Sequence, residues 1–220
     1  MRFDGLILDF DGVLLESEWA GNAQIAAFLT RSGHPTSVEE AMHRLMGLAG
    51  EEFRAAIERW IGRPVPEGFE AARAEEDRRV LAEGLEAVAG AVAFVRSLPP
   101  ALPRAVASSS SSEWVRTHLR HLGLDGAFGD KIFSGREHVA RGKPAPDLYL
   151  HAAAAIGVPV ARCAIVEDSP VGAEGAVASG ATVIGFVGGR HCLAGHADRL
   201  RQLGVRHIAR DFEEVAALLA

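Results

Sequence analysis

The sequence predicts an α/β fold, a Rossmann-like parallel sheet covered by helices, with an α-helical subdomain inserted after the first strand. Two observations predict this fold. Short apolar runs alternate with helical segments through most of the 220 residues, and such alternation forms parallel sheets through right-handed crossovers. The stretch from residue 17 to residue 88 departs from the pattern, because it offers helix after helix and no convincing strand. We therefore expect one domain over residues 1–16 and 89–220 and a helical domain over residues 17–88.

The first predicted strand is the apolar run from Leu6 to Phe10, which leads into acids and a glycine. Side chains alternate along a strand, so Asp9 and Asp11 point the same way and their carboxylates converge. Gly12 lets the backbone turn tightly and expose its N–H groups. The acidic pair alone indicates little, because strand ends often carry acids at turns.

Helical spacing dominates the inserted stretch. Helices are predicted over Ala20–Arg31 and from Phe69 to about Ala82. A further helical stripe lies between them and consists of Phe53, Ile57, Trp60 and Ile61. We interpret this stripe as hydrophobic core rather than as a cofactor site. The charged run from Glu75 to Arg79 is typical of a solvated helix face.

Further strands and helices alternate after the insert. The expected strands are Arg104–Ala107, Lys131–Phe133, Cys163–Val166 and Thr182–Phe186, and the expected helices are Ser111–Leu122, Pro146–Ile156 and Val171–Ser179. Glycines follow these helices where C-caps are expected. The ligand site of such a sheet lies beyond the carboxyl ends of its strands.

A second acidic pair, Glu167 and Asp168, ends the predicted strand Cys163–Val166. Ser169 is explained as a helix N-cap, with Pro170 at the first helical position. If this strand neighbours the first one, several carboxylates share one crevice. Two like charges about 4 Å apart repel by about 4 kcal/mol at an effective dielectric constant of 20. Such a cluster needs a cation, and oxygen ligands favour Mg²⁺.

Two other strand-end features could serve an anionic ligand. Ser108 opens a run of five serines directly after the strand Arg104–Ala107. Its hydroxyl and nearby N–H groups could bind phosphate, while one of Ser110 to Ser112 caps the next helix. Lys143 is one of only two lysines among 23 basic residues. A compact ammonium can neutralise a carboxylate or a phosphate, although a surface lysine before a proline turn is the alternative.

The composition of the chain limits the classes of partner that the protein is expected to bind. The net charge of −6 argues against a general nucleic-acid or anionic-membrane binder. No apolar stretch is long enough to span a bilayer, and no signal peptide is visible. Two cysteines make no disulfide framework, and Cys163 is interpreted as a buried thiol in a reducing compartment. We expect a cytoplasmic protein, either a monomer or a small homo-oligomer.

Taken together, these segments resemble the haloacid dehalogenase-like (HAD) superfamily over the whole chain. Asp9–Leu14 looks like the first motif of the superfamily, Ala107–Ser109 the second, Lys143-Pro144 the third and Val166–Ser169 the fourth. The helical insert resembles the mobile cap of the beta-phosphoglucomutase and phosphoglycolate phosphatase branch. The sequence looks most like the sugar-phosphate phosphatases of this branch, including the 6-phosphogluconate type.

The resemblance implies a role for each matching residue. Asp9 would be the nucleophile that forms an aspartyl-phosphate, and Asp11 the general acid and base. Mg²⁺ would be held by Asp9, the carbonyl of Asp11 and Asp168, with Glu167 close by or acting through water. Lys143 would also neutralise Asp9. The residues expected at the phosphate are Gly12, Ser108, Ser109 and Lys143.

Several reactions of this family are distinguished by single residues. Asp11 argues against a dehalogenase, which lacks the second aspartate. Residues 12–130 contain no lysine, so a phosphonate hydrolase with a cap Schiff base is disfavoured. A beta-phosphoglucomutase stays an alternative, although its cap arginine is replaced by Gly50 and its expected histidine by the stretch Trp19–Gly21. A catalytically inactive binding module is a further alternative. We predict a Mg²⁺-dependent phosphatase acting on a small phosphorylated metabolite, a sugar phosphate.

Three further groups of residues receive weaker interpretations. Arg44, Glu51 and Arg73 are candidates for substrate contact from the cap, although a solvated helix charge is the favoured interpretation of each. Glu16 and Ser17 are expected at the entry to the cap. His191, Cys192 and His196 could form a transition-metal site, but histidines of an ordinary loop are the favoured interpretation, and no function is assigned to them.

Overall fold

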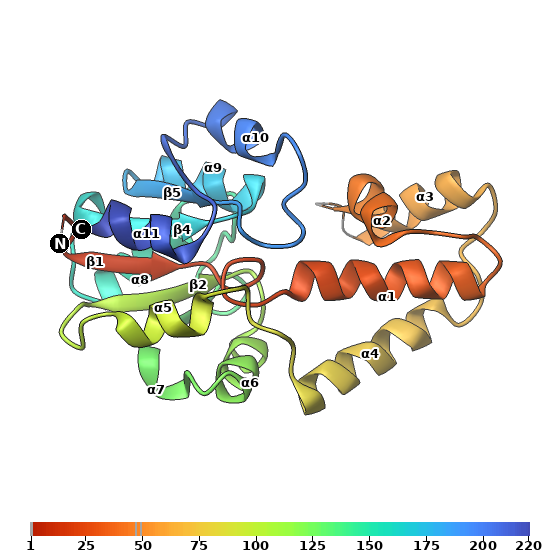
Figure 1. Cartoon of the computed structure of the whole chain (residues 1–220), viewed down its shortest axis with the longest axis horizontal. Helices are drawn as coiled ribbons and strands as arrows, with labels where there is room; N and C mark the ends of the chain where they lie inside the picture. Colours follow the sequence, from red (N-terminus) through yellow and green to blue (C-terminus); the bar gives the residue numbers. More distant parts are fainter. Residues whose placement is uncertain (1, 47, 49) are drawn as a thin grey trace. The chain divides into compact units, whose positions relative to one another are not determined.

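The computed structural model describes residues 2–46, 48 and 50–220, which form two compact units (Figure 1). The core unit comprises Met1–Glu16 and Leu85–Ala220, and the helical unit comprises Ser17–Gly84. The second boundary lies before the predicted residue 88. Val88 is buried in the apolar core of the core unit, and its N–H donates to the carbonyl of Leu14. These contacts explain why the returning chain joins the core unit early.

A parallel sheet forms the centre of the core unit. Its strands among the described residues are β1 (Gly5–Leu8), β2 (Arg104–Ser108), β3 (Ile132–Ser134), β4 (Cys163–Glu167), β5 (Thr182–Phe186) and β6 (His207–Ala209). They are arranged in the order β3-β2-β1-β4-β5-β6, and each pair is parallel. The predicted α/β fold is confirmed. Strand β6 was not predicted from the sequence.

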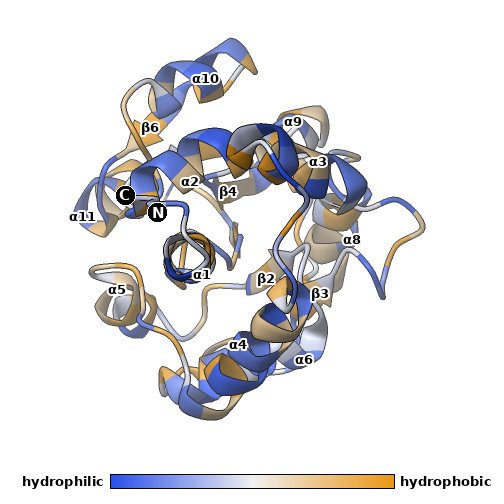
Figure 2. Cartoon of the chain, turned by 90° about the vertical axis from the view of Figure 1, so that its right-hand side faces the viewer, coloured by the Kyte–Doolittle hydropathy of each residue, from blue (hydrophilic) through white to orange (hydrophobic). Residues whose placement is uncertain are grey.

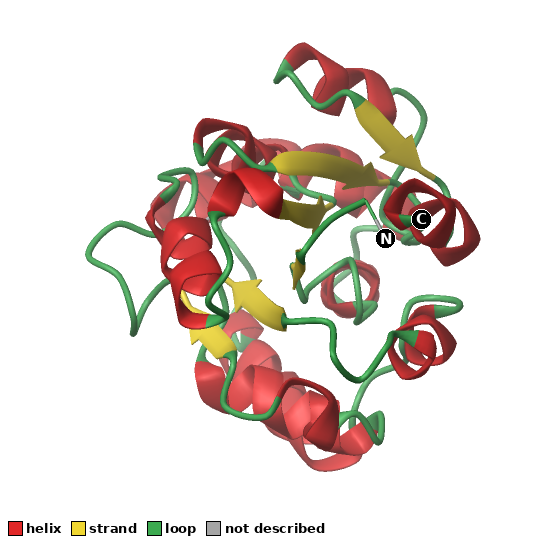
Figure 3. Ribbon diagram, turned by 90° about the vertical axis from the view of Figure 1, so that its left-hand side faces the viewer, coloured by secondary structure: helices red, strands yellow, loops and turns green. Residues whose placement is uncertain are grey.

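Helices cover both faces of this sheet (Figure 3). The helices of the core unit are α5 (Ala91–Ser97), α6 (Ser112–His121), α7 (Asp125–Phe128), α8 (Asp147–Ala155), α9 (Pro170–Ala178), α10 (His196–Gln202) and α11 (Phe212–Leu219). Leu6 and Leu8 of β1 pack in one apolar layer with α5, α6 and α11, whereas Ile7 packs in the other with α8 and α9. This alternation buries both faces, as expected for a parallel sheet.

Helix caps follow the sequence signals. Ser111 accepts a hydrogen bond from the N–H of Trp114 and caps α6. Ser169 caps α9 through the N–H of Gly172, with Pro170 at the first helical position, as predicted. The cap side chains satisfy N–H groups that the helix itself leaves without partners. Because of these caps, α6 begins shortly after the end of β2, and α9 begins shortly after the end of β4.

The helical unit consists of α1 (Ser17–Arg31), α2 (Val38–Leu45), α3 (Gly50–Ile61) and α4 (Phe69–Glu83). Its apolar core includes Leu29, Ile57 and Phe69, with Phe53 and Trp60 packed against them. The aromatic stripe is therefore core, as predicted. Hydrophilic residues prevail along α4 (Figure 2), where Glu76 and Arg79 form an ion pair. Gly47 and Ala49, in the loop compared with the mutases, lie outside the described residues. No helix within the described ranges is long and apolar enough to cross a membrane.

Candidate active site

The carboxyl ends of three neighbouring strands bring the predicted motifs together. Strand β1 lies between β2 and β4, with Leu8 in register with Val106 on one side and Val166 on the other. The N–H of Asp9 still donates to the carbonyl of Val166, at 2.9 Å. The condition that the two acid-bearing strands be neighbours is therefore met. The side chains that follow them share one edge of the sheet.

Three buried carboxylates form the centre of this edge. Asp9, Glu167 and Asp168 each offer an oxygen within 4.8 Å of the others, and all three are at most 5% exposed. Burial, and then the charge of Glu167, raise the pKa of Asp9 well above its usual range, against the opposing effect of Lys143. Carboxylate oxygens packed this closely suit a hard divalent cation, which would offset their repulsion. The residues present thus fit the cation that their arrangement implies.

Gly12 is required for the close approach of the turn after β1 to Asp168. Its φ of +82° lies in the left-handed region. A Cβ atom at this position would lie 2.2 Å from Oδ2 of Asp168. Any larger residue would therefore clash with a buried carboxylate of the cluster. The structure places Gly12 beside the metal-site acids, and its predicted phosphate contact stays a prediction.

Lys143 lies inside the carboxylate cluster rather than on the surface. Its Nζ donates to Oδ1 of Asp9 and, at 2.8 Å, to Oε2 of Glu167. Burial alone would lower the pKa of Lys143, but the charges of Asp9 and Glu167 raise it well above its ordinary value. The lysine is therefore a buried cation that partly neutralises the acids. This contact joins residues 134 positions apart.

Glu167 is held by a set of donors that the sequence analysis did not identify. The hydroxyl of Tyr149 donates to its Oε2 at 2.6 Å. The hydroxyl and the N–H of Ser169 donate to its Oε1 at 2.6 and 3.0 Å. Glu167 thus has each oxygen engaged and orients Lys143 toward Asp9. Tyr149 is the only tyrosine of the chain, which is the one signal that could have singled it out.

Asp11 faces the serine run after β2. Its Oδ2 accepts from the hydroxyls of Ser108 (3.0 Å) and Ser110 (2.7 Å), and its Oδ1 accepts from Nε1 of Trp114 (3.1 Å). These bonds hold the carboxylate beside the Asp9 cluster. Sequence reasoning missed Ser110 and Trp114, because their approach to Asp11 depends on β1 and β2 being neighbours. Ser109 is exposed, so its phosphate contact stays a prediction.

The cap candidates occupy different environments in the helical unit. The guanidinium of Arg44 lies 4.9 Å from the ring centroid of Trp60, and that of Arg73 lies 5.2 Å from the ring centroid of Phe53. Such contacts are typical of structural cation–π pairs. Glu51 is exposed in the first turn of α3. The suggested substrate contacts of all three residues stay predictions.

Two histidines contact Asp168, one from the loop after β5 and one from the first residue of α10. Nε2 of His191 lies 2.7 Å from Oδ2 of Asp168, and both side chains are buried. Nε2 of His196 lies 2.6 Å from the carbonyl oxygen of Asp168. A neighbouring loop contact involves Arg190, whose N–H donates to the buried carboxylate of Glu16. Sequence spacing alone could not place this loop beside the end of β4.

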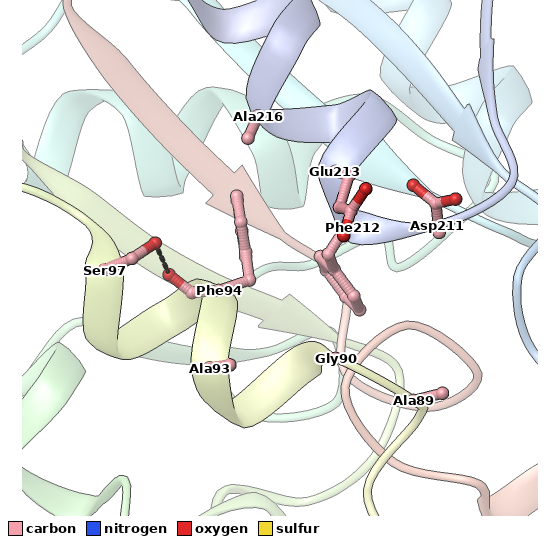
Figure 4. A pocket seen from close by; sticks show the side chains of 9 residues that line it. All are labelled: Ala89, Gly90, Ala93, Phe94, Ser97, Asp211, Phe212, Glu213 and Ala216. Atoms are coloured by element: carbon pink, nitrogen blue, oxygen red, sulfur yellow. Dashed lines mark hydrogen bonds between the residues drawn. The ribbon is translucent and has the colours of Figure 1, made fainter.

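A separate groove of the core unit lies between α5 and α11 and is not part of this site (Figure 4). Phe94 and Phe212 line it, together with alanines and the acids Asp211 and Glu213. None of the clustered carboxylates lines the groove. Its described lining has no basic side chain that would suit a phosphate. The hydroxyl group among the lining side chains is that of Ser97, which donates to the carbonyl of Phe94. We assign the groove no catalytic role.

Comparisons with known proteins agree with this geometry. Residues 3–180 match the family model described as haloacid dehalogenase-like hydrolase. The 6-phosphogluconate phosphatase of Escherichia coli (strain K12) is 30% identical over 192 residues, which are 86% of this chain and 85% of the relative. Hexitol phosphatase A of the same organism is 30% identical over 188 residues, 84% and 83% of the two chains.

A solved structure shares the whole architecture. The HAD family hydrolase from Deinococcus radiodurans R1, determined with bound phosphate and sodium, is 30% identical and has a TM-score of 0.89. The match covers all of this chain and 96% of the other. Fold, strand-end motifs and sequence similarity over most of the chain agree, and the chain belongs to the haloacid dehalogenase-like hydrolase family.

Proposed function

We propose that the chain is a Mg²⁺-dependent phosphatase that hydrolyses a small phosphorylated metabolite, a sugar phosphate, through an aspartyl-phosphate on Asp9. The observation that carries this proposal is the buried cluster in which Lys143 contacts Asp9 and Glu167, with Asp168 within 4.8 Å. A nucleophilic carboxylate, a cation-binding acid and a fixed ammonium are the groups that phosphoryl transfer requires.

The reaction divides into two displacements. In the first, a carboxylate oxygen of Asp9 attacks phosphorus, the bond from phosphorus to the ester oxygen breaks, and Asp11 gives its proton to the leaving alcohol. In the second, Asp11 removes a proton from water as the water oxygen attacks the phosphorus of the aspartyl-phosphate. Inorganic phosphate leaves and the Asp9 carboxylate is restored. The bonds from Ser108, Ser110 and Trp114 to Asp11 would hold its carboxyl group in place between the two steps.

Asp9, Asp168 and the carbonyl of Asp11 would hold Mg²⁺, which would supply positive charge to the phosphoryl oxygens. Lys143 contributes a second, permanent charge at the same place. Glu167 is assigned a positioning role, because its contacts with Lys143, Tyr149 and Ser169 engage both of its oxygens. The sequence analysis instead predicted that Glu167 lies close to the metal or contacts it through a water molecule.

The substrate class is supported by the relatives. Both curated relatives described above are named as phosphatases of phosphorylated sugar derivatives, and the Deinococcus structure carries phosphate. The helical unit is proposed as a cap domain that selects the leaving group. Arg44, Glu51 and Arg73 are proposed as its specificity residues.

The test is release of inorganic phosphate from a panel of sugar phosphates, with and without Mg²⁺. Wild-type protein should release phosphate only with the metal, and Asp9→Asn should release none. Asp130→Asn, which alters an exposed aspartate of the same unit, is the matched control and should behave as wild type. Equal turnover by Asp9→Asn would refute the nucleophile. A requirement for a sugar bisphosphate, with isomerised sugar phosphate as product, would indicate a mutase instead.

A further inference from the structure

Three side chains with nitrogen and sulfur ligand atoms gather in the loop that follows β5 and at the first residue of α10. His191, Cys192 and His196, hereafter the His–Cys–His cluster, each offer one such atom within 4.8 Å of the others. Sγ of Cys192 lies 3.3 Å from Nε2 of His191. The rings of His191 and His196 are 5.9 Å apart between centroids. The fold thus brings together the ligand atoms of three residues that the sequence alone suggested were part of an ordinary loop.

The distances suit a tetrahedral metal ion. With bonds of about 2.3 Å to sulfur and about 2.0 Å to nitrogen, ligand atoms around tetrahedral zinc lie about 3.3 to 3.5 Å apart. The pair formed by Cys192 and His191 already has this separation. The widest pair in the cluster would have to close by at most about 1.5 Å. Four residues separate His191 from His196, which is within the range seen for paired zinc-binding histidines.

We propose that the His–Cys–His cluster is a second metal site, selective for a borderline-soft divalent ion such as Zn²⁺. Thiolate and imidazole ligands favour this class of ion, whereas the carboxylates of Asp9, Glu167 and Asp168 favour a hard ion. The two sites therefore differ in chemistry although they adjoin. Three protein ligands leave a fourth position for water or for a neighbouring carboxylate.

The two sites are coupled through Asp168. Nε2 of His191 lies 2.7 Å from Oδ2 of Asp168, a shorter separation than two ligands of one zinc ion adopt. A zinc ion bound between His191 and Cys192 therefore breaks this hydrogen bond and attracts the Asp168 carboxylate. Asp168 is then a poorer ligand for Mg²⁺. Zinc at the His–Cys–His cluster thus inhibits the enzyme, a consequence that rests on the proposed function.

Cobalt is the probe for the site itself, because a thiolate bound to Co²⁺ gives a near-ultraviolet charge-transfer band that oxygen ligands do not give. The full-length protein is first saturated with Mg²⁺ and then titrated with Co²⁺. Wild type should develop the band with one equivalent of cobalt. Cys163→Ala, the matched control at the other cysteine, should retain it, and Cys192→Ala should lose it. Absence of the band in wild type, or its persistence in Cys192→Ala, would overturn the site.

Zinc inhibition tests the coupling separately. At saturating Mg²⁺, Zn²⁺ should inhibit phosphate release by wild type and by Cys163→Ala. In Cys192→Ala the zinc concentration for half-inhibition should rise about tenfold or more. Equal inhibition of both cysteine variants would place the inhibitory zinc on the carboxylates and overturn the coupling. A protein without phosphatase activity would refute the proposed function, while the cobalt titration would still decide whether the second site exists.

Discussion

Tyr149→Phe tests whether the buried hydroxyl on Glu167 organises the active site. The substitution removes one oxygen from a fully buried side chain and leaves the ring in place. The lost bond is a 2.6 Å hydrogen bond to a carboxylate. Hydrogen bonds to charged groups contribute about 1.5 to 3 kcal/mol. Because Lys143 and Ser169 still hold Glu167, we expect the free energy of unfolding to fall by about 2 kcal/mol, near the lower end of this range.

The same substitution should affect catalysis. Without the tyrosine hydroxyl, Glu167 is held less firmly by Lys143 and Ser169 alone, and Lys143 is directed less precisely at Asp9. Changes in residues that orient a metal site typically reduce activity about 10- to 100-fold, and we expect kcat to fall within this range. For a chain of this size about 2 kcal/mol corresponds to a fall in Tm of about 4 to 8 °C. Thermal unfolding followed by circular dichroism and phosphate-release kinetics measure the two effects.

Ser179→Ala is the matched control. The Ser179 hydroxyl is also buried in the core unit, but it donates to a neutral acceptor, the carbonyl of Ala176, at 2.6 Å. Its removal should cost about 1 kcal/mol and leave kcat unchanged. If Tyr149→Phe kept both the Tm and the kcat of wild type, Glu167 would not depend on the tyrosine and the positioning argument would be wrong.

Three further predictions follow from the same unit. Asp11→Asn removes the general acid and base and should lower kcat about 10²- to 10⁴-fold in the phosphate-release assay; a change of less than threefold would contradict this role. Gly172→Ala would place a Cβ atom 2.2 Å from the Glu167 carboxylate and should destabilise the protein by about 1 to 3 kcal/mol in urea unfolding. The control Gly126→Ala meets nothing within 4 Å and should be near neutral; equal effects would argue against the clash. Burial raises the pKa of the Cys163 thiol to about 11, so iodoacetamide at neutral pH should label this residue only after unfolding, as mass spectrometry would show. Because the unfolded thiol ionises at lower pH than the folded one, Cys163 also makes the free energy of unfolding decrease as the pH rises from about 9 toward 11.

Local sequence patterns predicted most of the core unit. The strand over Thr182–Phe186 has the predicted bounds, and the other predicted strands agree within a few residues. Caps such as Ser169 with Pro170 were also predictable, because capping depends on neighbours in the chain. Strand β6 and helices α10 and α11 received no prediction. Strand β6 pairs with β5, α10 packs against α9, and α11 packs against α5 and β6. These tertiary contacts stabilise segments whose own sequence patterns are short.

The acids and the lysine of the candidate site were predictable from the sequence, but the contacts between them and their other hydrogen-bond donors were not. Asp9, Glu167 and Asp168 stand out because acids follow apolar strands. The donors on Glu167 and Asp11 do not stand out, since Tyr149 and Trp114 lie on ordinary helical segments. Their roles arise where α8 and α6 pack beside the strand ends. Likewise, the sequence shows that His191, Cys192 and His196 lie near one another in the chain, but the contacts of the two histidines with Asp168 appear only in the folded structure.

By itself the sequence determined the α/β class, the helical insert and the acids and lysine at the strand ends. These features follow from the short-range periodicity and composition of the chain. Only the tertiary structure decided that Lys143 lies between Asp9 and Glu167 and that His191 lies on Asp168. The physical reason is the order of the strands. Pairing of β1 with both β2 and β4 is a property of the assembled sheet, and it sets which distant side chains share one buried, low-dielectric edge.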